Sequence, residues 1–236
     1  MKTTATTILL AFAMVAGATA QDLDEMYDQG LELFENNRFK DAENIFSEII
    51  KQDSSFNEAF VFRALSKHSL QDFNSALQDF ELALFNDPFD TLVYLMKADL
   101  ETDMELYEAA IVDYSNAITL NPEDADLYRS RGNLYYFLDH YLLSVQDFQE
   151  ASKLSPGDAS DYFYIGVSKN SLGLYNDALK YLSTAVSLAP DDAVIYFQRG
   201  IAQEATGNLE QACTDWRKAR ELGLEDIDDI LQQSCK

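Results

Sequence analysis

The sequence has few basic residues for its length, and this limits the kinds of partner that it can have. Its 236 residues include 17 Lys and Arg against 41 Asp and Glu, which gives a formal net charge of −24 at pH 7. Such an acidic surface repels nucleic acid and anionic lipid headgroups. It favours basic partners, although solubility is the commoner reason for a charge of this sign. We therefore expect protein partners and no nucleic acid.

The residue types that build catalytic and metal sites are also scarce. The two histidines, His68 and His140, lie far apart, and neither has a second His or a Cys at the spacing of a metal-binding helix. The sequence contains no His-Glu-x-x-His, no Gly-x-Ser-x-Gly and no glycine-rich phosphate loop. The acidic cluster that ends at Asp229 lacks the glycine turn and the ligand spacing of a calcium loop. The sequence predicts a protein that is not an enzyme and that uses no cofactor or metal.

Long hydrophobic runs are missing as well. The apolar run from Ile8 to Ala18 has 11 residues, too few to cross a bilayer. Lys2 precedes this run and Ala18-Thr19-Ala20 ends it, a pattern typical of a cleaved signal peptide. We predict that residues 1–20 are removed and that residues 21–236 form the exported protein, without membrane insertion. An uncleaved N-terminal anchor is the alternative.

Only four prolines are present, and they are spaced evenly. Pro88, Pro122, Pro156 and Pro190 follow one another at intervals of 34 residues. A fixed interval of this length indicates internal repeats. The same interval divides the chain into six units without insertion: residues 23–56, 57–90, 91–124, 125–158, 159–192 and 193–226. Residues 227–235 follow with one apolar and one polar face, which predicts a capping helix.

Each unit has small and large side chains at fixed positions. Position 8 is Gly or Ala and position 20 is Ala or Ser, so two helices can approach closely there, whereas positions 4 and 24 hold large side chains that fill the space between units. In residues 159–192 these positions are Tyr162, Gly166, Ala178 and Leu182. The units resemble tetratricopeptide (TPR) repeats, which have this period and this signature. The resemblance implies an all-α fold, a right-handed α-solenoid of six helical hairpins followed by the capping helix.

An aspartate stands directly before most of the predicted units. An Asp at that place can accept a hydrogen bond from the unpaired N–H groups of the first helical turn, and such an N-cap stabilises a helix by about 1 kcal/mol. Phe56 is the one exception among the seven helix starts. The predicted N-caps are Asp22, Asp90, Asp124, Asp158, Asp192 and Asp226.

Four units carry a basic residue at position 7 and an Asp at position 23. If each hairpin turns near position 15, both positions are equally far from the turn, so antiparallel helices place them side by side. The two remaining units lack both members together. The pattern predicts structural ion pairs within four repeats: Arg63 with Asp79, Lys97 with Asp113, Arg131 with Asp147, and Arg199 with Asp215.

The two cysteines lie in the last unit and in the predicted capping helix. Cys213 and Cys235 are equally far from the turn between those helices, so an antiparallel pair of helices brings them together. With an even count and an exported chain, a disulfide is favoured over two unpaired thiols. Residues 212–219, together with the late Cys, are similar to the last repeat of exported TPR proteins from Bacteroidetes-type bacteria. That resemblance implies the periplasm or outer envelope of a Gram-negative bacterium, or export beyond it.

In TPR proteins, positions 2, 5, 9 and 12 of the first helix line a concave wall that binds a peptide or helix. Here these positions are largely apolar and aromatic, with an acidic edge, and we expect neighbouring helices to cover about a third of them. The candidate groove residues are Tyr27, Leu31, Phe34, Val61, Leu65, Leu95, Asp99, Arg129, Asn133, Tyr136, Phe163, Asn170 and Phe197.

Arg129 and Asn133 also match the first two places of the carboxylate clamp in chaperone-binding TPR domains. The remaining places hold Tyr164, Val194 and Gln198 instead of Asn, Lys and Arg. We therefore reject recognition of a chaperone tail and retain Arg129 and Asn133 as candidates for holding one polar group of a ligand.

The sequence thus predicts a non-catalytic scaffold or adaptor of the cell envelope that binds a peptide or helix of another protein, favouring a basic one, in a concave groove. One alternative is an assembly subunit that oligomerises through convex faces or array ends. A second alternative is an accessory domain of an envelope enzyme. Partner identity, pathway and oligomeric state do not follow from the sequence.

Overall fold

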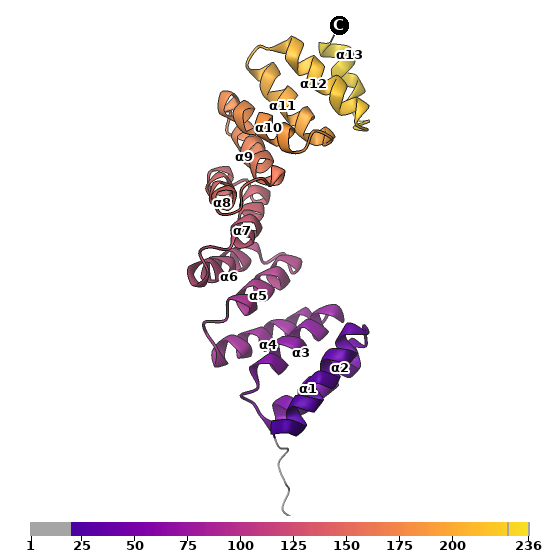
Figure 1. Cartoon of the computed structure of the whole chain (residues 1–236), viewed down its shortest axis with the longest axis vertical. Coiled ribbons are helices and arrows are strands. Elements are labelled where there is room, and N and C mark those ends of the chain that lie inside the picture. The colour runs from indigo at the N-terminus through magenta and orange to yellow at the C-terminus, as the bar shows by residue number, and fades with distance from the viewer. Residues whose placement is uncertain (1–19, 226, 236) are drawn as a thin grey trace, which may run out of the picture. The chain divides into compact units, whose positions relative to one another are not determined.

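The computed structural model describes residues 20–225 and 227–235, and these form thirteen α-helices and no strand (Figure 1). Residues 1–19 of the predicted signal peptide and the predicted N-cap Asp226 lie outside the described residues. The helices are α1 (Ala20–Glu35), α2 (Phe39–Gln52), α3 (Asn57–Ser69), α4 (Phe73–Asn86), α5 (Thr91–Asp103), α6 (Tyr107–Leu120), α7 (Ala125–Phe137), α8 (Tyr141–Leu154), α9 (Ala159–Ser171), α10 (Tyr175–Leu188), α11 (Ala193–Ala205), α12 (Leu209–Glu221) and α13 (Asp228–Ser234).

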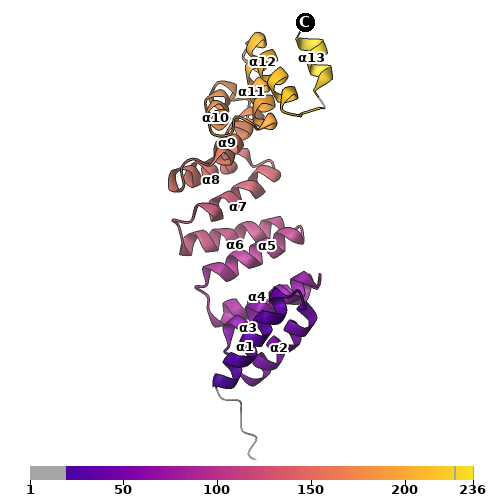
Figure 2. The same ribbon diagram turned by 45° about the vertical axis from the view of Figure 1, so that its right-hand side comes forward.

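The helices form antiparallel hairpins in two compact units. Unit 1 runs to Asp87 and contains α1–α4, and unit 2 starts at Pro88 and contains α5–α13. Within each unit the second helix of one hairpin packs against the first helix of the next, as Figure 2 shows for α6 with α7 and for α8 with α9. We call the first helices of the hairpins (α1, α3, α5, α7, α9, α11) the A helices and the second helices the B helices. The predicted all-α solenoid of helical hairpins is confirmed.

The helix ends follow the local sequence. From α3 to α11 the A helices begin at Asn57, Thr91, Ala125, Ala159 and Ala193, the residues that open the predicted units. The side chains of four of the predicted N-caps accept hydrogen bonds from N–H groups of the first turn; these are Asp90, Asp124, Asp158 and Asp192. Asp22 instead lies inside the first turn of α1, because that helix already begins at Ala20. The prolines all lie in the turns that precede α5, α7, α9 and α11.

Every hairpin turns at position 15, and that residue is left-handed in all six. Asn37, Gln71, Glu105 and Asp139 have φ between 58° and 63°, and Gly173 and Gly207 have φ of 73° and 84°. The N–H of the next residue bonds to the carbonyl five positions earlier, as Leu106 does to Glu101 at 2.8 Å, which closes the end of each A helix. This geometry places positions 7 and 23 beside each other.

Close approach of the two helices explains the small residues at position 8. A Cβ atom added to Gly30 would lie 2.6 Å from the Phe46 ring, and one added to Gly166 would lie 2.5 Å from Leu182. Both large side chains are fully buried. A glycine at position 8 therefore avoids a steric clash with the large side chain at position 24 of the B helix.

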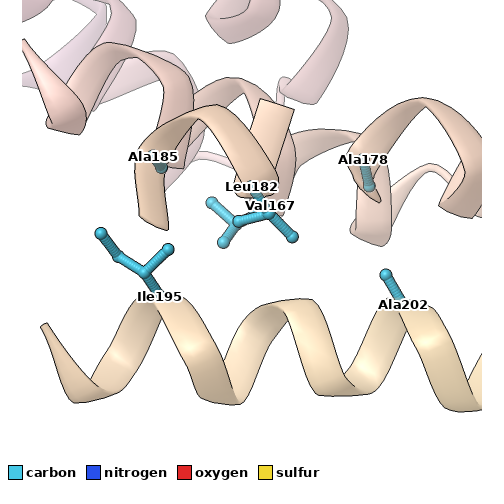
Figure 3. Close-up of a cluster of buried hydrophobic side chains, with 6 residues drawn as sticks. All are labelled: Val167, Ala178, Leu182, Ala185, Ile195 and Ala202. Carbon is cyan, nitrogen blue, oxygen red and sulfur yellow. The ribbon is translucent and has the colours of Figure 1, made fainter. Parts of the chain in front are cut away.

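The core between successive repeats of unit 2 is formed by buried side chains from adjacent hairpins. Figure 3 shows Ile195 of α11 facing Val167 of α9 and Leu182 of α10, and Ala202 of α11 facing Ala178 of α10. At the C-terminal end, α13 covers the last hairpin: Ile227 is buried and Ile230 and Leu231 pack against the cluster around Trp216. The capping role predicted for residues 227–235 is consistent with this packing. Within the described part of the chain, no helix combines the length and apolar character needed to cross a membrane.

Candidate functional site

The A helices of each unit form one face, and the predicted groove positions lie on it. In unit 2, Asn170 of α9 donates a hydrogen bond of 3.0 Å to the carbonyl of Gln198 in α11, and α7 contacts α9 through Arg129. In unit 1, the rings of Tyr27 in α1 and Phe62 in α3 lie 5.8 Å apart. We define the inner face of a unit as positions 2, 5, 9 and 12 of its A helices.

The aromatic candidates of unit 1 pack against its buried core. The ring of Tyr27 lies 5.3 Å from that of Phe56 and 6.0 Å from that of Phe46, and Phe34 lies 5.9 Å from Phe62. Leu31 packs against the same cluster. Burial also raises the pKa of Tyr27, with smaller contributions from nearby carboxylates. These three residues therefore stabilise the unit, and they, like Val61 and Leu65, keep part of their surface exposed.

The apolar candidates of unit 2 are also partly covered. Leu95 packs against the clusters of α6 and α7, and Phe197 against the terminal cluster. The ring centroid of Tyr164 lies 5.4 Å from that of Tyr136 and 5.3 Å from that of Phe163. Each of these four side chains keeps part of its surface exposed. Among the predicted wall positions of unit 2, Val167 is buried and these four are partly covered.

The exposed side chains of the inner face of unit 2 are apolar or acidic, with one amide. They are Leu92, Asp99, Asp126, Asn133, Val194 and Glu204. Asp99 accepts a hydrogen bond of 2.5 Å from the hydroxyl of Tyr114. Burial of Tyr114 is the main cause that raises its pKa, and this hydrogen bond is the second. Asn170 is not among the exposed residues, because it joins α9 to α11. Within unit 2, predicted candidates Asp99 and Asn133 therefore remain accessible to a partner.

Arg129 does not offer a free positive charge. Its Nε and Nη2 atoms donate to the two carboxylate oxygens of Asp161 at 2.8 Å each, its Nη1 donates to Asp126 at 2.7 Å, and Asp158 lies 3.6 Å away. The hydrogen bonds to Asp161 raise the pKa of Arg129 despite partial burial. With three carboxylates around one guanidinium, this cluster carries a net negative charge. The predicted role of Arg129 in holding an anionic ligand group does not fit this geometry, which instead favours a cation.

The four ion pairs predicted from positions 7 and 23 are present. Arg63, Arg131 and Arg199 each donate two hydrogen bonds to Asp79, Asp147 and Asp215, at 2.6–2.8 Å, and Lys97 donates to Asp113. All four aspartates are buried. Hydrogen bonding to its Asp raises the pKa of Arg131 and of Arg199, outweighing the effect of burial. These pairs join the A helix of each hairpin to its B helix.

Two of these pairs have a third member that the sequence reasoning missed. Lys67 donates to Asp79 at 2.7 Å, and Glu101 accepts from Lys97 at 2.6 Å. Both third members occupy position 11, one turn after position 7, so the i,i+4 spacing of Lys97 and Glu101 was the available signal. The hairpin of α3 and α4 thus has two cations on one carboxylate, and the hairpin of α5 and α6 has two carboxylates on one cation.

Glu101 is the least well satisfied ionisable group among these pairs. Glu101 is 3% exposed, and its Oε2 atom has no hydrogen-bond partner within the described residues. Burial raises the pKa of Glu101, and the neighbouring Lys97 only partly opposes the effect. Burial tends to lower the pKa of Lys97, but its hydrogen bonds to Asp113 and Glu101 raise it overall. Glu101 therefore costs folding free energy when it is ionised.

The predicted disulfide partners lie together at the end of unit 2. The Sγ atoms of Cys213 in α12 and Cys235 after α13 are 2.05 Å apart, and their Cα atoms are 5.4 Å apart. Arg220 of α12 also lies 2.9 Å from Asp228 of α13. A covalent bond and an ion pair thus hold the capping helix on the last hairpin.

Comparisons with known proteins agree with this architecture. A family model for the tetratricopeptide repeat matches residues 27–91, and a second model for the TPR repeat matches residues 98–138. No curated protein matches the chain.

Solved structures with the same fold include YrrB, described as a TPR protein with an unusual peptide-binding site. It shares 20% identity with this chain at a TM-score of 0.69, covering 77% of this chain and 94% of its own. The C-terminal part of a TPR repeat-containing protein from Cytophaga hutchinsonii has a TM-score of 0.72 at 17% identity and covers 83% of this chain and 78% of its own. A tetratricopeptide repeat protein from Parabacteroides merdae has a TM-score of 0.68 at 17% identity and covers 92% of this chain and 100% of its own.

Proposed function

Because this chain is a tetratricopeptide-repeat protein, we propose that it is a non-catalytic interaction scaffold whose unit 2 binds a basic, partly apolar segment of another protein along its A helices. TPR folds serve protein–protein interaction. The observation that carries it is the composition of the exposed inner face of unit 2, where Leu92 and Val194 are apolar and Asp99 and Asp126 are acidic.

The electrostatics of α7 and α9 support a basic partner. Arg129 is the one basic residue at positions 2, 5, 9 and 12 of α5, α7, α9 and α11, and the carboxylates of Asp126, Asp158 and Asp161 surround it. A Lys or Arg of a partner placed near Asp126 would meet a net negative field. An acidic segment or a C-terminal carboxylate would be repelled there.

The apolar residues supply the second half of the recognition. Leu92 and Val194 are exposed, and Tyr136 and Phe163 keep part of their rings accessible between them. Aromatic side chains of this kind provide contact area at a low cost in conformational entropy. The solved protein YrrB, whose description names a peptide-binding site on a TPR fold, supports the choice of a peptide segment as the ligand.

The test is selection of binders from a random peptide display library on the full chain, followed by affinity measurement with two variants. Asn133→Arg adds charge and bulk to the inner face, and Gln146→Arg adds the same group to α8, where the side chain is also exposed. We expect the selected peptides to combine Lys or Arg with apolar residues and to bind Asn133→Arg at least about tenfold more weakly. Gln146→Arg should bind them like the wild type.

Peptides without basic residues, or equal loss of affinity in both variants, would contradict the proposed site. Because Asn133 and Gln146 are both exposed, neither variant is expected to unfold the protein, and thermal unfolding curves provide the check.

We also propose that the protein acts in the envelope of a Gram-negative bacterium. The sequence of residues 1–20, the pairing of Cys213 with Cys235, and solved relatives of this fold from Cytophaga and Parabacteroides support this placement. Mass spectrometry of the protein from fractionated cells tests it. We expect a periplasmic or outer-envelope product that begins at Gln21 and contains the disulfide, and a reduced cytosolic product that keeps residues 1–20 would contradict it.

A further inference from the structure

Unit 2 has a second exposed apolar surface, along the turns that join its A helices to its B helices. Phe137 at the end of α7 is 63% exposed and Leu142 near the start of α8 is 64% exposed. Leu106 and Leu143 are exposed at the same edge. Glu105 and Glu108, beside Leu106, are exposed as well. We call these six residues the turn edge of unit 2.

Contacts between neighbouring turns make the turn edge continuous. The ring of Phe137 lies 4.9 Å from that of Tyr107, which begins α6, so the first two turns of unit 2 are joined. Residues 139–143 and Leu172 of the following turn line a shallow hollow of about 310 Å³. The edge therefore presents an apolar strip over three successive hairpins, and packing within the protein leaves most of Phe137 and Leu142 uncovered.

The charge at this edge is of one sign. Residues 98–128 contain five Asp and four Glu and no Lys, Arg or His. Asp139 adds a carboxylate in the next turn, where it accepts a hydrogen bond from Tyr141. Within unit 2, the lysines of the next hairpin, Lys169 and Lys180, both pair with Asp177. The apolar strip is thus bordered by carboxylates, and His140 is the one basic side chain among the residues that line its hollow.

We propose that the turn edge of unit 2 is a docking surface for a basic amphipathic helix of another protein. Its apolar side chains would cover Phe137, Leu142 and Leu143, and its Lys and Arg would face Glu105, Glu108 and Asp139. Charge complementarity selects this occupant. A second copy of this chain carries the same formal charge of −24, and an anionic membrane surface is repelled for the same reason.

This surface is distinct from the inner face, so the proposal does not rest on the function proposed above. To separate the two, every protein in the test carries Asn133→Arg, which blocks the inner face if that face binds basic segments. The probe is a helical peptide about 18 residues long with Leu on one face and Lys on the other, and its analogue has Glu in place of every Lys.

Leu142→Lys and Glu108→Lys are the test variants, and Leu188→Lys is the matched control. Leu188 is an exposed leucine at the far end of α10, away from the turn edge. We expect the Leu/Lys peptide to bind the parent protein, each test variant to bind it at least about tenfold more weakly, and Leu188→Lys to stay within about twofold. Hydrogen exchange should slow in residues 104–108 and 137–143.

Three results would overturn the proposal. The first is equal affinity of the parent and the test variants for the Leu/Lys peptide, or equal binding of the Leu/Glu analogue. The second is concentration-dependent self-association that Leu142→Lys abolishes, which would assign the edge to a second copy of the chain. The third is binding to vesicles of anionic lipid that Leu142→Lys abolishes, which would assign it to a membrane surface.

Discussion

The guanidinium of Arg129 in α7 forms a two-pronged ion pair with the carboxylate of Asp161 in α9, and this pair crosses from one repeat to the next. Both hydrogen bonds are 2.8 Å long, and the Asp161 side chain is 0% exposed. The four ion pairs between positions 7 and 23 join helices within a hairpin. Arg129 and Asp161 instead join two hairpins of unit 2, so they hold the inner face of α7 and α9 in place.

Removing the Asp161 carboxylate should therefore weaken the stacking of repeats. We expect Asp161→Asn to lower the free energy of unfolding by about 3 kcal/mol, because Arg129 loses its buried counter-ion. Asp126→Asn is the matched control. That carboxylate bonds to the same guanidinium but is 84% exposed, so its loss should cost less than about 1 kcal/mol. Urea denaturation of both variants measures the difference, and equal effects would show that burial of the pair is unimportant.

The left-handed residue at position 15 offers a stabilising substitution. Glu105 has a φ of 60°. In this backbone conformation the Cβ atom comes too close to the following carbonyl oxygen, whereas glycine has no Cβ atom and adopts the conformation freely. We expect Glu105→Gly to raise the free energy of unfolding by about 0.5–1 kcal/mol. Gly173→Ala, at the equivalent position with a φ of 73°, should lower it by about 1 kcal/mol. Glu105→Ala removes the charge but keeps the strain, so a gain in that variant would refute the backbone explanation.

The buried carboxylate of Glu101 predicts an unusual dependence of stability on pH. Its pKa in the folded protein lies above the ordinary value of 4.5, so its ionisation favours the unfolded chain as the pH rises from 4.5 through the folded pKa. We expect Glu101→Gln to raise the melting temperature at pH 7 and to have little effect well below pH 4.5, where Glu101 is protonated in both states. Glu108→Gln, at an exposed position, should show no such trend. A Glu101→Gln variant that is less stable at pH 7 would mean that the second ion pair of Lys97 outweighs the burial cost.

The bond between Cys213 and Cys235 should stabilise the end of unit 2. The two residues are 22 positions apart, and closing a loop of this size contributes about 3 kcal/mol. Reduction of the wild type and the double change Cys213→Ser and Cys235→Ser should lower stability by similar amounts and should accelerate hydrogen exchange in α13. Unchanged exchange in α13 after reduction would show that apolar packing around Trp216 suffices to hold the helix.

The sequence predicted the contacts that depend on position within one repeat. The spacing of the prolines fixed the boundaries of the 34-residue units, and these boundaries predicted the first residues of α3, α5, α7, α9 and α11. Residues equally far from the turn of an antiparallel helix pair lie side by side, and this paired Arg63 with Asp79 about Gln71 and Cys213 with Cys235 about Leu224. These relationships need only helix geometry, which the 34-residue period supplies.

Contacts between repeats were harder to predict, because they depend on how one hairpin rotates against the next. The sequence suggested that Arg129 binds a ligand, although Asp161 in the next repeat could have indicated an ion-pair partner for it. Position 3 is otherwise mostly apolar, as in Val93 and Leu127, and Arg129 is the one charged residue at position 5. Two unusual residues in adjacent repeats should have suggested a pair. The same difficulty applies to Tyr136 and Phe163, which pack partly against Tyr164.

Binding of a basic segment to the acidic and apolar inner face of unit 2 can be measured by hydrogen exchange of the full chain, with and without a peptide selected on it. We predict that exchange slows in α5, α7, α9 and α11 and that Asn133→Arg abolishes the effect. Slowing confined to α6, α8, α10 and α12, with Asn133→Arg behaving like the wild type, would contradict binding at this face.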